Sequence, residues 1–402
     1  MSQRMQLRGL RSEDEERAWD SFMHYAFEPE KDVQQWLETR RKMQETAAEE
    51  KLGYYRGDEM VAACGLIPFR GRLRGSMIPL GAVSDVATPP ENRFQGHARN
   101  MLRELLLLMR ERNLCTSVLW PFYEGFYAAM GWVVSADHSQ FKFSEKDMHR
   151  LTRDFEMNRT FSQFSGDDPS DLNRVHSAWG SNYELTIERD LDWWQTRVLT
   201  QWDRKPYVYV CRNTAGDPVG YLAYFIEGDW EKRTLVVVEM AYVDLDTYRA
   251  QLRFLAGHVS QVRQYRITVP PNDPLWDWHV TGKVVRQKGI MFRIVDVMQA
   301  LEFPRYPESV RATVTMAVRD PFADWNDGVF RFNVQGGKAE VTRDNGQPDF
   351  EIGIGALSQM FTGHRSAGQL VASGALRIAC REVQGMLSRV FPPRQVYMME
   401  EF

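Results

Sequence analysis

The stretch that most constrains this chain runs from Val83 to Ala98, with the sequence Val-Ser-Asp-Val-Ala-Thr-Pro-Pro-Glu-Asn-Arg-Phe-Gln-Gly-His-Ala. It predicts a strand, a proline-marked turn and a glycine-containing loop that opens a helix. The helix should cover residues 99–113, because an apolar stripe repeats along it at Met101, Leu102, Leu105, Leu106 and Met109. Free N–H groups at a helix start, next to a glycine, suit a phosphate or pyrophosphate. An ordinary strand–turn–helix without a ligand fits the same residues.

The composition narrows the classes of partner. A chain of 402 residues has room for two or three domains, and 43% hydrophobic with 26% charged residues is typical of a globular protein. The net charge of −4 supplies no basic excess to replace counterions, which argues against nucleic acid as a partner. Neither an N-terminal signal core nor a membrane-spanning apolar stretch is present, so we expect a cytoplasmic protein without a membrane partner.

The cysteines predict no metal site. Their spacings match neither a metal knuckle nor a redox pair, and we expect buried, reduced thiols at Cys64, Cys115, Cys211 and Cys380.

The first 145 residues are predicted to fold in one continuous order of elements. A strand at Met5 precedes two helices, the second from Asp32 to Lys51, and three strands lie between Leu52 and Thr88. After the long helix come a short apolar strand, a short helix that ends at Gly131 as a C-cap, and a closing strand from Val133 to Phe143.

This order resembles the GNAT superfamily of N-acetyltransferases. Arg93-Phe-Gln-Gly-His-Ala98 is similar to its Arg/Gln-x-x-Gly-x-Gly/Ala pyrophosphate loop. Phe126-Tyr-Ala-Ala-Met-Gly-Trp132 is similar to its Phe/Tyr-Tyr-x-x-x-Gly-Phe/Tyr segment. The resemblance implies acetyl-CoA as co-substrate and no metal. It implies that backbone groups of Val86 and Thr88 bind the pantetheine arm and the thioester. The pyrophosphate would lie in the loop residues Arg93, Gln95, Gly96 and Ala98.

The loop departs from the superfamily in its charge. Relatives often carry two or three basic residues here, whereas this chain has Phe94 and Gln95. Binding would therefore depend chiefly on backbone donors.

Acetyl transfer from a thioester to an amine needs a base, an acid for the leaving thiolate and donors for the developing oxyanion. By resemblance the acid is Tyr127. Tyr123, one helical turn earlier, is the competing tyrosine, and an aromatic residue that only anchors the short helix is the alternative.

The middle region, residues 146–287, repeats the same plan without the pyrophosphate loop. Helices are expected at Asp171–Trp179 and Asp190–Trp202, followed by strands, a helix and a strand. We interpret it as a second, degenerate GNAT-like domain.

The C-terminal region, residues 288–402, opens with a strand entering a helix over Met291–Leu301. Alternating strands follow, then helices at Ser366–Ser373 and Ala375–Val390. This region resembles the sterol carrier protein-like α+β fold. The fold class is thus α/β (α+β): tandem GNAT-like domains, 1–145 and 146–287, followed by a sterol carrier protein-like domain, 288–402.

The three-part order resembles the Eis family of acetyltransferases over essentially the full length. That resemblance implies that the α-carboxylate of Phe402 is the base, since such a group is ionised at neutral pH. Glu400 and Glu401 would add negative charge beside a cationic amine. A C-terminal aromatic that only packs, and a solvated acidic tail, are the alternatives.

The implied reaction is direct acetyl transfer in a ternary complex. The acceptor would be a primary amine of a polycationic small molecule, aminoglycoside- or polyamine-like, or a lysine. The family also implies a homo-oligomer, a hexamer by resemblance. The rival hypothesis is a non-catalytic protein whose sterol-carrier-like domain holds an apolar ligand, with the GNAT unit as its scaffold.

Overall fold

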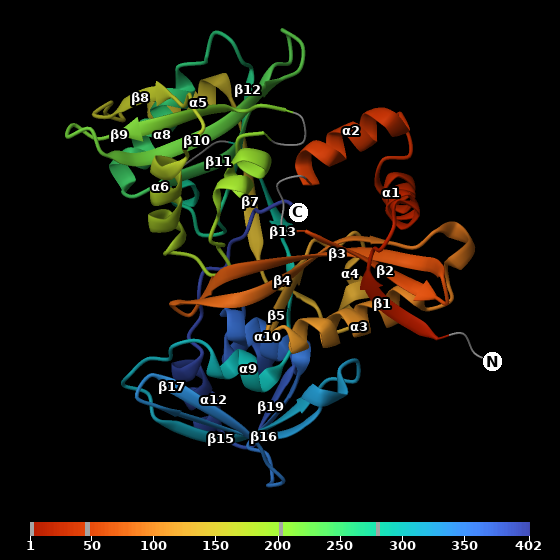
Figure 1. Cartoon of the computed structure of the whole chain (residues 1–402). Helices are drawn as coiled ribbons and strands as arrows, with labels where there is room; N and C mark the ends of the chain where they lie inside the picture. The colour runs from red at the N-terminus through yellow and green to blue at the C-terminus, as the bar shows by residue number, and fades with distance from the viewer. Residues whose placement is uncertain (1–3, 45–48, 201–203, 279–281) are drawn as a thin grey trace. The chain divides into compact units, whose positions relative to one another are not determined.

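The computed structural model describes residues 4–44, 49–200, 204–278 and 282–402, with backbone alone for residues 41–44. The chain divides into two compact units. The first unit comprises Met1–Ser135, Ile290–Arg394 and Phe402, and the second comprises Ala136–Gly289 and Gln395–Glu401. The first unit holds a seven-stranded and a five-stranded sheet, and the second holds another seven-stranded sheet (Figure 1). Helices and sheets are mixed throughout, as the predicted class requires.

The first seven-stranded sheet is largely antiparallel. Its order is β1 (Met5–Gly9), β2 (Glu50–Arg56), β3 (Glu59–Leu73), β4 (Ser76–Ala87), β5 (Thr116–Leu119), β14 (Met291–Ile294) and β6 (Val133–Val134). β3 and β4 form a hairpin that turns on Arg74 and Gly75, whose φ angles of 49° and 75° are those of a tight hairpin turn.

Four helices accompany this sheet: α1 (Glu13–Phe27), α2 (Val33–Gln44), α3 (His97–Glu111) and α4 (Glu124–Ala128). The apolar stripe predicted for the long helix is confirmed, because α3 buries all five of its stripe residues in the core of this sheet. The second helix, expected from Asp32 to Lys51, is described from Val33 to Gln44, and its expected end is wrong because β2 already begins at Glu50. Residues 45–48 lie outside the described residues.

Two strands belong to other sheets than the sequence grouping implied. β14, grouped with the C-terminal region, lies between β5 and β6, where Met291 pairs with both Leu119 and Val134. β7 (Asp137–Ser144), grouped with the first region, pairs with β12 and β13 of the second unit. Alternation along a strand specifies its two faces, but not the strand beside it.

The second unit orders its strands β13 (Lys283–Lys288), β7, β12 (Gln264–Val269), β11 (Thr234–Tyr242), β10 (Pro218–Glu227), β9 (Tyr207–Arg212) and β8 (Thr160–Gln163). Its helices are α5 (Glu145–Thr152), α6 (Ser170–Gly180), α7 (Leu191–Trp193) and α8 (Leu245–Ala256). A π-helical turn, Trp194–Val198, continues α7, so the helix expected over Asp190–Trp202 is interrupted. Residues 201–203 lie outside the description.

The five-stranded sheet has the order β17 (Lys338–Arg343), β16 (Gly328–Gln335), β15 (Ala312–Arg319), β18 (Phe350–Gly353) and β19 (Leu376–Ile378). Its helices are α9 (Val297–Glu302), α10 (Ile354–Thr362), α11 (Ala367–Ala372) and α12 (Arg381–Val390). The helix expected over Ala375–Val390 begins only at Arg381, because Leu376–Ile378 pairs with β18 instead.

Helix α10 joins the two sheets of the first unit. It packs against β14 and β6 of the seven-stranded sheet and against β18 and β15 of the five-stranded sheet. Arg74, in the β3–β4 turn, donates from Nε to the Phe361 carbonyl at 2.7 Å and from Nη2 to the Met360 carbonyl at 2.9 Å. A guanidinium on the last carbonyls of a helix satisfies acceptors that have no intrahelical partner.

Three of the cysteines, Cys64, Cys115 and Cys211, are buried free thiols, whereas Cys380 is exposed. Within the described parts of the chain, no helix has the length and apolar character to cross a membrane.

Candidate active site

A separation of two parallel strands creates the candidate site. β4 and β5 pair from Leu80 with Thr116 as far as Val83 with Leu119, and β4 then continues to Ala87. Asp85 has a φ of 52°, and the register of β4 against β3 shifts at this point, which marks a β-bulge. Beyond Val83, β4 has no pairing with β5, so backbone groups near Val86 on that edge of β4 have no hydrogen bonds to β5.

The loop after β4 is folded by its own side chains. Arg93 donates from Nε to the Thr88 carbonyl at 3.0 Å, and Gln95 donates from Nε2 to the Glu91 carbonyl at 3.0 Å. Gly96 is the N-cap of α3 with a φ of 81°, and no side chain caps the helix there. Only glycine adopts this conformation without strain, and the first N–H groups of α3 remain available to an anion.

These elements enclose a cavity of about 680 Å³. Of the residues predicted to bind the cofactor, it is lined by Val86, Thr88, Arg93, Gly96 and Ala98. Gln95 is not part of the lining. The structure adds residues that were not predicted to bind the cofactor, above all the apolar side chains Phe27, Phe122 and Phe126.

The loop has little cationic character for a phosphate site. Phe94 is fully exposed with a φ of 60°, and the cations that line the cavity are Arg93 and Arg99. Burial, together with the nearby Arg56, lowers the pKa of His97, so this imidazole is neutral at neutral pH. The arrangement therefore depends on backbone N–H groups and the α3 dipole for most of its attraction to an anion.

Tyr127, the predicted acid, lies directly behind the cavity wall. Its ring is 5.4 Å from that of Phe122 and 5.1 Å from that of Phe126, measured between centroids, and both of these rings line the cavity. Tyr127 itself is 2% exposed and does not line it. Burial raises the pKa of Tyr127, so it holds its proton at neutral pH. Tyr123, the competing residue, is 66% exposed.

Phe402 belongs to the first unit and does not line the cavity either. Its ring meets that of Phe69, on β3, edge to face at a centroid distance of 5.9 Å. The aromatic ring is thus packed, as both hypotheses for this residue require.

The residues before Phe402 are bound within the second unit. Val396 pairs with Glu184, and Glu184 donates its backbone N–H to the Gln395 carbonyl at 2.8 Å. Glu400 is buried: its Oε1 accepts from Arg189 Nη2 at 2.9 Å, and its Oε2 accepts from Trp193 Nε1 at 2.9 Å. Its carboxylate is therefore engaged inside the protein.

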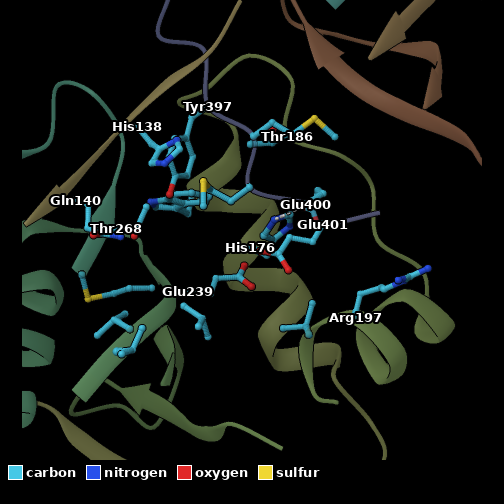
Figure 2. Close-up of a pocket in the computed structure, with 18 of the residues that line it drawn as sticks. His138, Gln140, His176, Thr186, Arg197, Glu239, Thr268, Tyr397, Glu400 and Glu401 are labelled. Atoms are coloured by element: carbon cyan, nitrogen blue, oxygen red, sulfur yellow. Dashed lines mark ion pairs between the residues drawn. The ribbon is translucent and has the colours of Figure 1, made fainter. Parts of the chain in front are cut away.

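The neighbours of Glu400 form a buried charge network. Arg189 also donates to Glu239 at 2.8 Å, and the carboxylates of Glu239 and Glu400 outweigh burial and raise the pKa of Arg189. Burial lowers the pKa of His176, whose Nε2 lies 4.0 Å from Glu400. His176 is therefore neutral, and Arg189 is the cation that balances the glutamates. Figure 2 shows His176, Glu239 and Glu400 gathered at one side of the cavity.

The cavity beside this network measures about 280 Å³, and Glu401 lines it. Its charged lining consists of three arginines and three glutamates: Arg189, Arg197, Arg266, Glu239, Glu400 and Glu401. The wall is thus mixed in charge rather than uniformly acidic. Glu400 was singled out from the sequence, but its buried partners were not, because Arg189 and Glu239 are far from it in the chain and meet it only through folding.

Comparison with known proteins agrees with the three-part reading. Residues 6–135 and 185–294 each match a model described as an acetyltransferase (GNAT) domain, and residues 297–399 match a sterol carrier protein domain. The N-acetyltransferase Eis of Mycobacterium tuberculosis is 24% identical over 364 residues, covering 83% of this chain and 84% of that protein. An uncharacterized N-acetyltransferase of Streptomyces avermitilis is 24% identical over 359 residues, with the same coverage.

The chain is an Eis-like N-acetyltransferase of the GNAT superfamily. Solved structures share its whole fold. A probable N-acyltransferase from Enterococcus faecalis superposes with a TM-score of 0.88 at 19% identity, covering 99% of this chain and 100% of the other. Eis1 from Mycobacterium abscessus superposes with a TM-score of 0.77 at 19% identity, with the same coverage.

In this Eis-like acetyltransferase, the bulge of β4 carries a second set of polar residues that the sequence reading missed. Asp85 forms an ion pair with Arg40 of α2, whose guanidinium also lies over the rings of Trp19 and Trp36 at 5.5 and 5.6 Å. Next to it, Ser84 donates to Glu49 at 2.5 Å. A carboxylate with two indole rings is a setting that holds a cation. An aspartate inside an otherwise apolar strand was the available signal.

Proposed function

We propose that this enzyme transfers the acetyl group of acetyl-CoA to a primary amine of a polycationic small molecule, aminoglycoside- or polyamine-like, or to a lysine. The single observation that supports acetyl-CoA as the acetyl donor is the cavity of about 680 Å³ at the separation of β4 and β5, which the Gly96 loop borders. It combines unpaired strand backbone for an amide-containing arm with an uncapped helix N-terminus for a pyrophosphate.

The residues around this cavity fit acetyl-CoA. Val86 and Thr88 would bind the pantetheine arm through their backbones. Arg93, Gly96 and Ala98 would hold the pyrophosphate, with Gln95 supporting the loop through its bond to Glu91. When bound, the thioester supplies the activated acetyl group. The apolar wall of Phe122 and Phe126 would exclude water from it.

We assign the proton donor to Tyr127. Its raised pKa keeps the phenol protonated, and its ring contacts Phe122 and Phe126, which line the cavity. A proton released to the leaving thiolate would favour its departure. Direct transfer in a ternary complex is part of this proposal. It is supported by Cys64, Cys115 and Cys211, because burial raises the pKa of these three thiols and keeps them protonated, which disfavours them as nucleophiles for a covalent acetyl-enzyme.

We assign the base to the α-carboxylate of Phe402 and place the cationic acceptor near Glu401. An ionised carboxylate can take the proton that the ammonium loses. Glu400 has a different part in this scheme. Its bonds to Arg189 and Trp193 fix the segment that precedes Phe402, so it would act by holding the tail. We also expect a homo-oligomer, a hexamer by family resemblance. Light scattering on the full chain measures the mass of the particle in solution and tests this.

The first test concerns the base. Turnover of acetyl-CoA is measured with a panel of polyamines and aminoglycosides, for the full chain, for a chain lacking Phe402 and for a chain extended by one glycine. Both changes should lower kcat by roughly 10²–10⁴-fold, because both remove the carboxylate from its place. Wild-type turnover in both variants would contradict the assignment of Phe402 as the base. An absence of acetyl-CoA binding would contradict the assignment of acetyl-CoA as the acetyl donor.

The second test concerns the acid. Tyr127→Phe should lower kcat by roughly 10²–10⁴-fold with little change in KM for acetyl-CoA, because the ring stays packed and only the proton is lost. Tyr123→Phe is the matched control and should stay near wild type. A reversal of the two results would give the role to Tyr123.

A further inference from the structure

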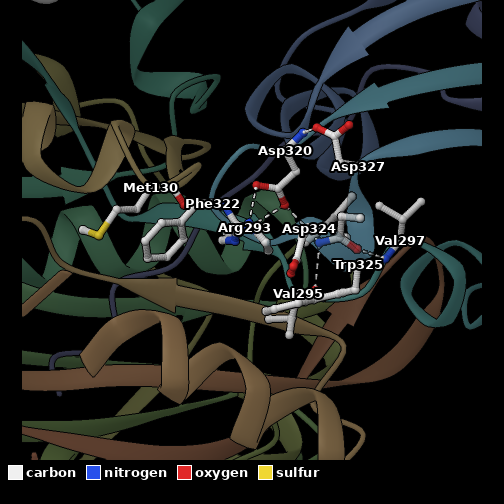
Figure 3. Close-up of polar contacts among 12 residues, drawn as sticks. Met130, Arg293, Val295, Val297, Asp320, Phe322, Asp324, Trp325 and Asp327 are labelled. Atoms are coloured by element: carbon white, nitrogen blue, oxygen red, sulfur yellow. Dashed lines mark hydrogen bonds and ion pairs between the residues drawn. The ribbon is translucent and has the colours of Figure 1, made fainter. Parts of the chain in front are cut away.

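A buried ion pair links the five-stranded region to the segment that carries Tyr127. Arg293, on β14, is completely buried, and its guanidinium lies 5.4 Å from the ring of Trp132 and 5.7 Å from that of Phe322. Its Nη2 donates to Asp320 Oδ2 at 2.5 Å, and this ion pair is drawn in Figure 3. Both side chains are 0% exposed. Burying two charges is expensive unless the geometry is fixed by further hydrogen bonds, so such pairs are better suited to specifying an arrangement than to raising stability.

Asp320 is held in place by hydrogen bonds with residues close to it in the chain. Its Oδ2 also accepts from Asn326 Nδ2 at 3.0 Å, and its Oδ1 accepts from the Ala323 backbone N–H at 3.2 Å. The backbone N–H of Asp320 donates to Asp327 Oδ2 at 2.9 Å. The carboxylate is therefore a rigid acceptor that holds Arg293 in one orientation.

Arg293 reaches the Tyr127 segment with its other nitrogen. Its Nη1 donates to the carbonyl of Met130, just beyond α4. Within this segment, the backbone N–H groups of Met130 and Trp132 both donate to the Tyr127 carbonyl, at 3.0 and 3.2 Å. The backbone of Tyr127 is thus held by Met130, and Met130 is held by Arg293.

Gly131 makes room for this contact. Its φ is 89°, and a Cβ at this position would lie 1.8 Å from Arg293 Nη1. Two reasons therefore favour glycine at this position of the second superfamily motif: its backbone conformation and the guanidinium that lies beside it.

We propose that Arg293 and Asp320 are positioning residues for the proton donor. They set the orientation of Tyr127 relative to the cavity wall, which makes the sterol-carrier-like domain a structural part of the active site. This rests on the proposed role of Tyr127. The short α4, five residues long, has too few internal hydrogen bonds to fix that orientation alone.

The test is a double-mutant cycle on the full-length enzyme. Arg293→Met replaces the cation by an apolar side chain of similar length and should lower kcat about tenfold or more, with KM for acetyl-CoA changed less than threefold. In the Tyr127→Phe background the same substitution should change kcat less than twofold, because no proton donor is left to position. Equal losses in both backgrounds, or an unchanged kcat in the single variant, would overturn the proposal.

Two further variants keep the result interpretable. Asp320→Asn preserves the volume and removes the charge, and it replaces Arg293→Met if that variant does not fold; the same non-additivity with Tyr127→Phe is expected. Arg103→Met is the matched control, because Arg103 also links the first region to the five-stranded region, through Asp324 at 3.2 Å and the Phe322 carbonyl at 3.3 Å, and neither partner belongs to the Tyr127 segment. It should keep wild-type kcat, and a loss as large as that of Arg293→Met would count against positioning. If Tyr127→Phe alone retains kcat within threefold, the role of Tyr127 itself fails, a result distinct from additivity.

Discussion

In both seven-stranded sheets, two parallel strands pair over part of their length and the first of them leads into a helix. The two units differ in how that strand is connected to the helix. In the first unit, β4 and β5 run parallel and separate, and residues 88–96 form a loop before α3. In the second unit, β11 and β12 run parallel from Thr234 with Gln264 to Val237 with Ile267, and β11 then continues to Tyr242. There only Val243 and Asp244 separate the strand from α8.

The helix N-termini at these junctions differ in what fills them. Gly96 offers no side chain to α3, whereas the carboxylate of Asp244 accepts from the Thr247 backbone N–H at 2.7 Å and lies 3.4 Å from Arg159. A pyrophosphate at the second junction would meet a like charge and a donor already in use. The same sheet plan thus leaves the helix start uncapped in one unit, whereas a single aspartate and a shorter connection occupy it in the other.

Among the changes that test this comparison of the two junctions, Gly96→Ala has the largest expected effect. A side chain in the left-handed region costs about 1–2 kcal/mol, which the loop can relieve only by moving the N–H groups of α3. KM for acetyl-CoA should rise about tenfold, since each 1.4 kcal/mol is a factor of ten. Gly75→Ala is the control. Its φ of 75° imposes a similar strain with no atom within 4 Å, so it should lower Tm without changing KM. An unchanged KM in Gly96→Ala would mean that the loop does not bind the donor.

Asp244→Ala tests the second junction with an intermediate effect. Loss of the cap should destabilise the protein by about 0.5–2 kcal/mol, measured by thermal or denaturant unfolding, while KM for acetyl-CoA stays the same. Asp244→Asn keeps a capping oxygen and should lie close to wild type. Detection of a second bound acetyl-CoA in Asp244→Ala by calorimetry would show that Asp244 alone prevents binding at the second junction. A changed KM would show that the second unit contributes to donor binding.

The smallest effect is expected from His97→Gln, which tests whether the first loop relies on its backbone. The lowered pKa means that the native state binds a proton less readily than the unfolded chain. Wild-type His97 is therefore neutral at pH 7.5, and KM should change less than twofold there. As the pH falls through 6.5 and below, wild type alone loses the stability that this neutral imidazole contributes. A large rise of KM at pH 7.5 would show that His97 acts as a cation.

Local chemistry made much of the site predictable. The stripe of α3 follows from helical periodicity, and the position of Gly96 follows from the turn chemistry that precedes a helix. The segment that ends at Gly131 is equally local, because its glycine has the positive φ of a C-cap. These features depend on residues close together in the chain. The bounds of the two helices were predicted less well, because α3 spans His97–Glu111 rather than 99–113, and α4 ends at Ala128, with Ala129 as its C-cap, rather than at Gly131.

Long-range partners were beyond the sequence reading. Nothing in the alternation of Met291–Ile294 identifies β5 and β6 as its neighbours. The tail was read as acidic and free to meet a substrate, but folding brings Glu400 to Arg189, 211 positions away.

By itself, then, the sequence determined the order of domains, the pyrophosphate-type loop and the tyrosine segment, because each is encoded in short-range periodicity and glycine placement. Only the tertiary structure decided what holds them: the Asp85–Arg40 pair at the bulge, the Arg293–Asp320 pair behind Tyr127, and the closed helix start at Asp244. Buried charges are stable only when their partners are in place, and those partners come from distant parts of the chain.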